Sequence, residues 1–86
     1  MSLRKLLCYM ANQWRNDVLL NEIARRLREC RRAIGKSQEA VYFDTGIHVG
    51  RIEIAQYNIS VSTLSRLCQY YGITLEELFK GIETNE

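Results

Sequence analysis

Residues 37–53, SQEAVYFDTGIHVGRIE, constrain the fold more than any other part of the chain, because they contain two short helical segments with almost no connection between them. Ser37 can cap the first segment, since its hydroxyl can accept a hydrogen bond from a free N–H group of the first helical turn. The second segment is expected to be a helix over residues 46–54 with Thr45 as its cap. Two residues three positions apart give this helix a narrow apolar stripe, Val49 and Ile52.

The other positions near the start of this second helix are expected to face outward, and they are Gly46, Ile47, His48 and Arg51. Arg51 can donate two hydrogen bonds to a guanine edge, His48 is the second candidate for a base contact, and Ile47 can touch a thymine methyl group. Gly46 can offer only its backbone N–H, which suits a phosphate. A short helix with this arrangement is built like a reader of the DNA major groove.

Apolar residues at helical spacing account for most of the remaining chain. The clearest helix begins after Asp17, its expected cap, ends at Gly35, and has the stripe Leu20, Ile23, Leu27, Cys30 and Ile34. The next begins after Ser60 or Ser62, ends at Gly72, and has the expected buried face Val61, Leu64, Leu67, Cys68 and Tyr71. The sequence contains neither proline nor strand-like alternation, so we predict an all-α protein.

Thr74 and Glu77 have the spacing of a capping box at the start of a last short helix. The residues of this helix that are expected to face the core are Leu75, Leu78 and Phe79. Residues 20–80 are thus expected to form one five-helix domain, followed by a polar tail over residues 81–86.

Residues 1–19 are expected to add an amphipathic helix in front of this domain, with the apolar stripe Leu3, Leu6, Leu7, Met10 and Trp14. A five-helix core of this size is already closed, so the stripe must be covered in another way. Two alternatives remain open. The stripe packs against a second copy of the chain, which produces a homodimer, or it folds back on its own domain.

Composition and charge limit the functions open to the chain. Its 86 residues, 47% hydrophobic and 26% charged, are typical of one small globular domain. The net charge of +2 is mild, but residues 23–51 are locally basic and residues 74–86 locally acidic. Three cysteines without a C-x-x-C spacing indicate a reducing compartment, so we expect a cytoplasmic, nucleoid-associated protein without a membrane span.

No pattern in the sequence predicts an enzyme. His48 is the single histidine and has no serine or cysteine partner at motif spacing. A phosphate-binding glycine loop and a cluster of metal ligands are also absent from the sequence. We therefore expect no catalytic residue, no metal, no cofactor and no small-molecule substrate.

Several segments in a fixed order resemble the lambda-repressor-like helix-turn-helix family, the Cro/repressor type that is also called the xenobiotic-response-element type. They are Arg28-Glu29-Cys30-Arg31, Ser37-Gln38-Glu39, Arg51-Ile52-Glu53, Asn58-Ile59-Ser60, Thr63-Leu64 and residues 71–78. The resemblance covers roughly residues 20–80 and leaves residues 1–19 unexplained. It implies a five-helix DNA-binding domain whose second and third helices form the DNA-binding unit.

The resemblance also implies roles for particular residues. Arg31 and Glu53 occupy the positions of a largely buried ion pair. The residues expected to contact phosphates are Gln38, Thr45, Tyr57 and Asn58. The chain departs from the family in having roughly one helical turn less between Ser37 and Glu53, and in having Gly50 within the second helix, Ala55 in place of a glycine after it, and Tyr42 in place of a small residue.

Three hypotheses of function remain. The first is a sequence-specific transcriptional regulator, such as a repressor, that binds double-stranded DNA as a homodimer. The second is a protein-interaction module of the same fold, such as an antitoxin or an accessory subunit, that does not bind DNA. The third is a small structural dimer. A steep dependence of binding on salt concentration is expected for the first alone.

Overall fold

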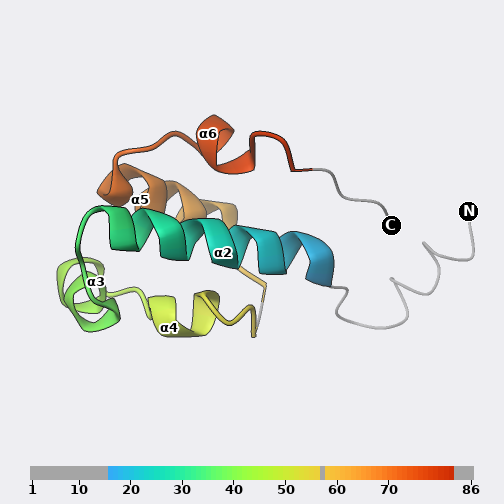
Figure 1. The fold of residues 1–86 in the computed structure, drawn as a ribbon. Coiled ribbons are helices and arrows are strands. Elements are labelled where there is room, and N and C mark those ends of the chain that lie inside the picture. Colours follow the sequence, from blue (N-terminus) through green and yellow to red (C-terminus); the bar gives the residue numbers. More distant parts are fainter. Residues whose placement is uncertain (1–15, 57, 83–86) are drawn as a thin grey trace, which may run out of the picture.

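The computed structural model describes residues 16–56 and 58–82, and these residues are organised as helices and connecting turns (Figure 1). The helices are α2 (Asp17–Ala33), α3 (Gln38–Thr45), α4 (Val49–Ile52), α5 (Val61–Tyr71) and α6 (Leu75–Phe79). The predicted all-α, five-helix domain is therefore confirmed. The predicted N-terminal helix, the expected contact residue Tyr57 and the end of the polar tail lie outside the described residues.

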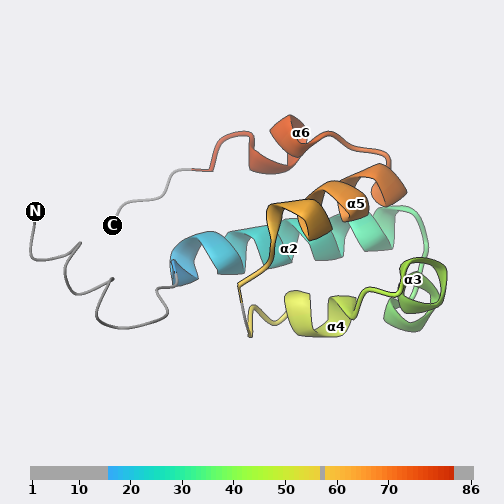
Figure 2. The ribbon, with the colours of Figure 1, turned by 180° about the vertical axis from the view of Figure 1, so that it is seen from behind.

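The long helix α2 runs through the middle of the domain. Helices α3 and α4 lie on one side of it, and α6 lies on the other, as Figures 1 and 2 both show. The helices α3 and α4 contact each other, and α6 contacts both α2 and α5. This arrangement leaves the α3–α4 pair at one edge of the domain, away from α6.

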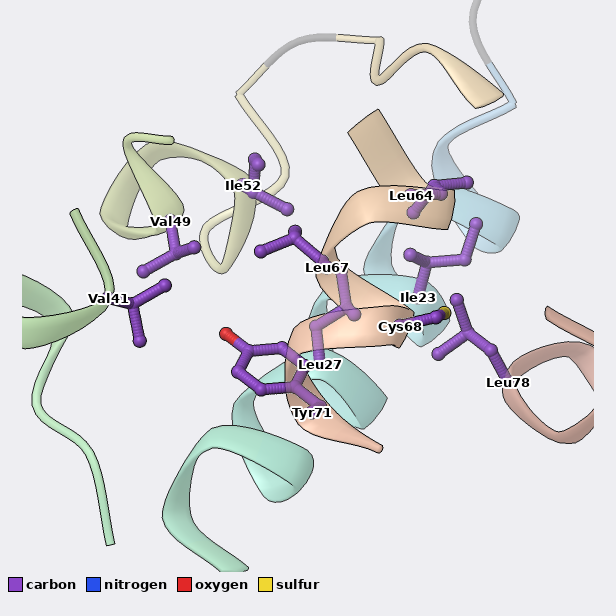
Figure 3. Packing of buried hydrophobic residues seen from close by; sticks show 10 residues of the cluster. All are labelled: Ile23, Leu27, Val41, Val49, Ile52, Leu64, Leu67, Cys68, Tyr71 and Leu78. Carbon is purple, nitrogen blue, oxygen red and sulfur yellow. The ribbon is translucent and has the colours of Figure 1, made fainter. Parts of the chain in front are cut away.

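The core forms where the apolar stripes of all five helices meet. Figure 3 shows Leu67 in the middle of the cluster. The buried residues of α3 and α4 lie on one side of Leu67, and Leu78 of α6 lies on the other. The buried residues are Ile23 and Leu27 of α2, Val41 of α3, Val49 and Ile52 of α4, Leu64, Leu67, Cys68 and Tyr71 of α5, and Leu78. The predicted stripe of Val49 and Ile52 is thus confirmed.

The Tyr71 hydroxyl lies inside this cluster and points toward Val41 and Val49 (Figure 3). Among the described residues it has no hydrogen-bond partner. Burial raises the pKa of this phenol above its ordinary value of 10.0, because the charged form would lose its hydration. Tyr71 therefore acts as a neutral core residue rather than as a proton donor or acceptor.

Side-chain caps fix where most helices begin. Ser37 accepts a hydrogen bond from the Ala40 N–H, and Ser60 accepts one from Thr63. Thr74 and Glu77 form the predicted capping box. The prediction of Asp17 as a cap was wrong by one position, because the Asn16 side chain accepts the bond from Leu19 and Asp17 is the first helical residue.

Three residues of the expected apolar stripes are exposed. Ile34 was predicted to belong to the stripe of α2 but is 39% exposed, because α2 ends at Ala33 and Ile34 is its cap. Val61 was predicted to belong to the buried face of α5 but is 70% exposed, because it is the first residue of that helix and has no preceding turn to pack beside. Phe79, at the end of α6, is 37% exposed. Both side chains lie near the end of the domain at which α2 begins, since both line one hollow with Asn16.

Three helical segments end with the same pair of backbone hydrogen bonds. At the end of α2, the Gly35 N–H donates to the Arg32 carbonyl, and the Lys36 N–H donates to the Arg31 carbonyl. This is the Schellman motif, which needs a left-handed residue. Gly35 (φ 69°) and Gly72 (φ 79°) supply it after α2 and α5, and Ala55 (φ 55°) supplies it after α4.

Replacing Ala55 with glycine is expected to stabilise the protein by about 0.5–1 kcal/mol. The strain energy of alanine in the left-handed conformation is larger than the additional entropic cost of ordering glycine, which is more flexible in the unfolded chain. Urea denaturation of the variant measures the gain. Gly35→Ala is the matched control, since it places alanine in the same motif after α2 and should destabilise the protein. A loss of stability in Ala55→Gly would contradict the expectation.

Candidate nucleic-acid interface

The connection between α3 and α4 differs from the sequence prediction. Thr45 was expected to cap a helix over residues 46–54, but it is the last residue of α3. Its buried hydroxyl donates to the Val41 carbonyl and accepts from the Ile47 N–H. Gly46 has a positive φ of 76° and ends α3, with its N–H bonded to Tyr42. Neither Thr45 nor Gly46 therefore begins the second helix.

Helix α4 is a single turn, Val49–Ile52, preceded by His48. His48 makes no side-chain capping bond; its ring stacks on Tyr42, with 4.3 Å between the ring centroids. Ile47 was expected to face outward but is half-buried and packs against the core, because the turn after Gly46 folds the connecting segment inward. His48 and Arg51 are exposed, as predicted.

The predicted ion pair between Arg31 and Glu53 is present. The Arg31 Nε lies 2.8 Å from one carboxylate oxygen of Glu53, and its Nη2 lies 3.0 Å from the other. Glu53 is 2% exposed, and the Arg31 side chain is 12% exposed. The hydrogen bonds with Glu53 raise the pKa of Arg31 above its ordinary value. The pair fastens the end of the α4 turn to α2.

Two more side chains converge on Glu53. Gln38, the first residue of α3, donates from Nε2 to the carboxylate at 3.1 Å. Arg28 donates from Nη2 to the Glu53 backbone carbonyl at 2.9 Å. Glu53 therefore connects α2, the start of α3 and the end of the α4 turn. The sequence did not predict this role of Arg28, and the nearness of α2 to the chain after α4 is a tertiary feature without a local sequence signal.

Gly50 allows Gln38 to lie against α4. A Cβ at this position would come within 3.2 Å of the Gln38 Oε1. The Tyr42 ring, one turn further along α3, is stacked on His48. A shallow hollow of about 260 Å³ lies between α3 and α4, lined by Gln38, Glu39, Tyr42, His48, Val49 and Gly50.

Most arginines of the basic stretch are held by other parts of the protein. Arg25 pairs with Glu22 and Glu29, and Arg26 pairs with Glu22 and donates to backbone carbonyls near the end of α6. The hydrogen bonds from both arginines lower the pKa of Glu22 to about 2. The side chain of Arg51, by contrast, makes no hydrogen bond or ion pair with another described residue, and Arg51 is exposed on α4.

The expected contact residues thus fall into three groups. Gln38, His48 and Arg51 lie together on the α3–α4 pair. Asn58 is exposed but precedes α5, where it borders a different hollow that is lined mainly by α2 and α5. Thr45, Gly46 and Ile47 shape the connection between the two helices. Tyr42 belongs with the first group through its stacking on His48, which spacing alone did not indicate.

No group of three histidine, cysteine, aspartate or glutamate side chains among the described residues is placed to hold a metal ion. None of the described helices has the length and apolar character needed to cross a membrane.

Comparison with known proteins gives one match. A helix-turn-helix family model matches residues 27–78, which include the end of α2, the α3–α4 pair, α5 and most of α6. No individual curated protein and no solved structure matches the chain.

Proposed function

Because the chain belongs to the lambda-repressor/Cro-like helix-turn-helix family of DNA-binding regulators, we propose that it is a sequence-specific transcriptional regulator that reads the major groove of double-stranded DNA with the exposed side of α4. A homodimer would present two such helices to half-sites about one helical turn, roughly 34 Å, apart.

The observation that supports this proposal best is the division of α4 and its turn into a held side and an exposed side. Ile52 and Glu53 are buried, and Glu53 is bonded to both α2 and α3. Arg51, directly beside them, is exposed, and its side chain makes no hydrogen bond or ion pair with another described residue. An unpaired guanidinium on a helical turn whose backbone is fastened to the core suits bidentate recognition of a guanine edge.

His48 is proposed as the second base contact, oriented by the ring of Tyr42. Gln38 is proposed to contact a phosphate next to the groove, because its side chain lies at the start of α3 beside α4. Asn58 and Tyr57 are proposed to touch the backbone further along the duplex. Thr45 is not part of this contact set, since its hydroxyl is buried and bonded within the protein.

Replacing Arg51 with alanine is expected to weaken binding to the preferred site by about 1–3 kcal/mol and to relax base preference at one position. The preferred site is first selected from random-sequence duplexes. Binding is then followed by fluorescence anisotropy at two salt concentrations, since electrostatic contacts with phosphates make affinity fall with salt.

Arg25→Ala is the charge-matched control for this experiment. Arg25 is also exposed, but it lines hollows on the side of α2 that faces α6, away from the α3–α4 pair. It should leave base preference unchanged. Equal losses for the two variants, without a change in base preference, would contradict the proposed role of Arg51.

One observation favours a second candidate, a protein-interaction module. Phe43 on α3 is 90% exposed, and Ile54 after α4 is 60% exposed. Exposed aromatic side chains are common anchors of protein interfaces. If this candidate holds, Phe43→Ser abolishes capture of a protein partner, and no duplex is bound at either salt concentration.

A further inference from the structure

An apolar hollow opens at the end of the domain where α2 begins. Its volume is about 240 Å³, and its lining is almost entirely apolar. The chief lining residues come from α2, α5, α6 and the segment before α5, and they are Leu19, Leu20, Ile59, Val61, Leu64 and Phe79. The hollow lies below the roughly 300–1,000 Å³ of small-molecule sites, so its size suits a protein side chain.

The rim of this hollow leaves apolar surface uncovered. Val61 is 70% exposed and Phe79 is 37% exposed, although both belong to amphipathic helices. Leu20 and Leu64, at the bottom, are buried. Covering the exposed part would remove apolar surface from water, which is favourable in proportion to the area covered.

The first described residue of the chain borders the same hollow. Asn16, the cap of α2, is one of the lining residues. Trp14 lies two residues before it in the sequence, so the two Cα atoms are at most roughly 7 Å apart. Leu3, Leu6, Leu7, Met10 and Trp14 recur at helical spacing and form one apolar stripe in the sequence.

We propose that residues 3–14 fold back on their own domain, with the Trp14 side chain in the hollow between α2, α5 and α6. Because Trp14 is joined to α2 by the chain itself, this contact is intramolecular. The effective concentration of the Trp14 side chain at the hollow is then roughly millimolar, the value for a short flexible linker. A second copy of the chain would have to compete with that concentration. The stripe of residues 3–14 is therefore used within one chain, and the homodimer of the proposed function would need another surface. The proposal does not depend on DNA binding.

Trp14 is the single tryptophan of the chain, so its fluorescence reports on this contact directly in the full-length protein. We expect emission at shorter wavelength than in the urea-unfolded chain, and quenching by acrylamide that is several-fold weaker. Both properties should be unchanged on dilution. Val61→Asp places a charge at the rim of the hollow and should move the emission and the quenching toward the values of the unfolded chain.

Ile54→Asp is the matched control, because Ile54 is an exposed aliphatic residue outside the hollow. It should leave Trp14 protected, and circular dichroism verifies that both variants remain folded. Three results would overturn the proposal: a solvent-exposed Trp14 in the unmodified protein, equal effects of the two variants, or protection that disappears on dilution as the molecular mass falls by half. The last result would assign the hollow to a second copy.

Discussion

Replacing Glu53 with alanine is expected to lower the free energy of unfolding by about 3–5 kcal/mol. The carboxylate receives two hydrogen bonds from Arg31 and one from Gln38, and it is almost completely buried. Its removal would leave the guanidinium of Arg31, itself largely buried, without a counter-charge. Urea denaturation followed by circular dichroism measures the change.

Glu29→Ala is the matched control for this prediction, because Glu29 also pairs with an arginine of α2 but at an exposed site. Exposed ion pairs contribute little to stability. Similar losses for Glu53→Ala and Glu29→Ala would mean that the buried pair is solvated in solution. DNA binding should be lost in Glu53→Ala even where the protein remains folded, since α4 would no longer be fastened to α2.

Replacing Leu67 with alanine is the second change with a large expected effect, about 2–5 kcal/mol of destabilisation. Leu67 is fully buried in the middle of the core, between the α3–α4 side and the α2 and α6 side (Figure 3). A chain of 86 residues is expected to have a total stability of roughly 4–13 kcal/mol. The variant should therefore be partly unfolded well below the melting temperature of the unmodified protein.

Thermal unfolding with Val18→Ala as control tests this second expectation. Val18 is on α2 and is 64% exposed, so its truncation should change stability by no more than about 0.5 kcal/mol. A loss for Leu67→Ala that is no larger than this would mean that the surrounding helices close the space left by the missing side chain.

Local signals in the sequence were sufficient for most of the fold. The caps at Ser37 and Ser60 and the capping box at Thr74 depend on hydrogen bonds within one helical turn, so spacing reveals them. Gly35 and Gly72 end their helices because the left-handed conformation suits glycine. The choice between the neighbouring residues Asn16 and Asp17 could not be made in this way, because both side chains can cap.

The connection between α3 and α4 could not be predicted with the same means. Thr45 is as suitable for starting a helix as for bonding the carbonyl four residues before it, and only the packed structure selects the second arrangement. Gly46 is compatible with a helix start and with a left-handed helix end. In the site, Arg31 and Glu53 were predicted from the family resemblance, whereas the contacts of Arg28 and Gln38 with Glu53 depend on how three helical segments meet.

In and beside the single turn of α4, neighbouring residues have two different roles: some attach the turn to the protein, and others are exposed at its surface. Ile52 and Glu53 attach it to the rest of the protein, and His48 and Arg51 remain at the surface. Amino-acid changes at the two surface positions would therefore leave the attachment intact. Under the proposed function, a set of variants at His48 and Arg51 alone should yield proteins with new target sequences on an unaltered scaffold.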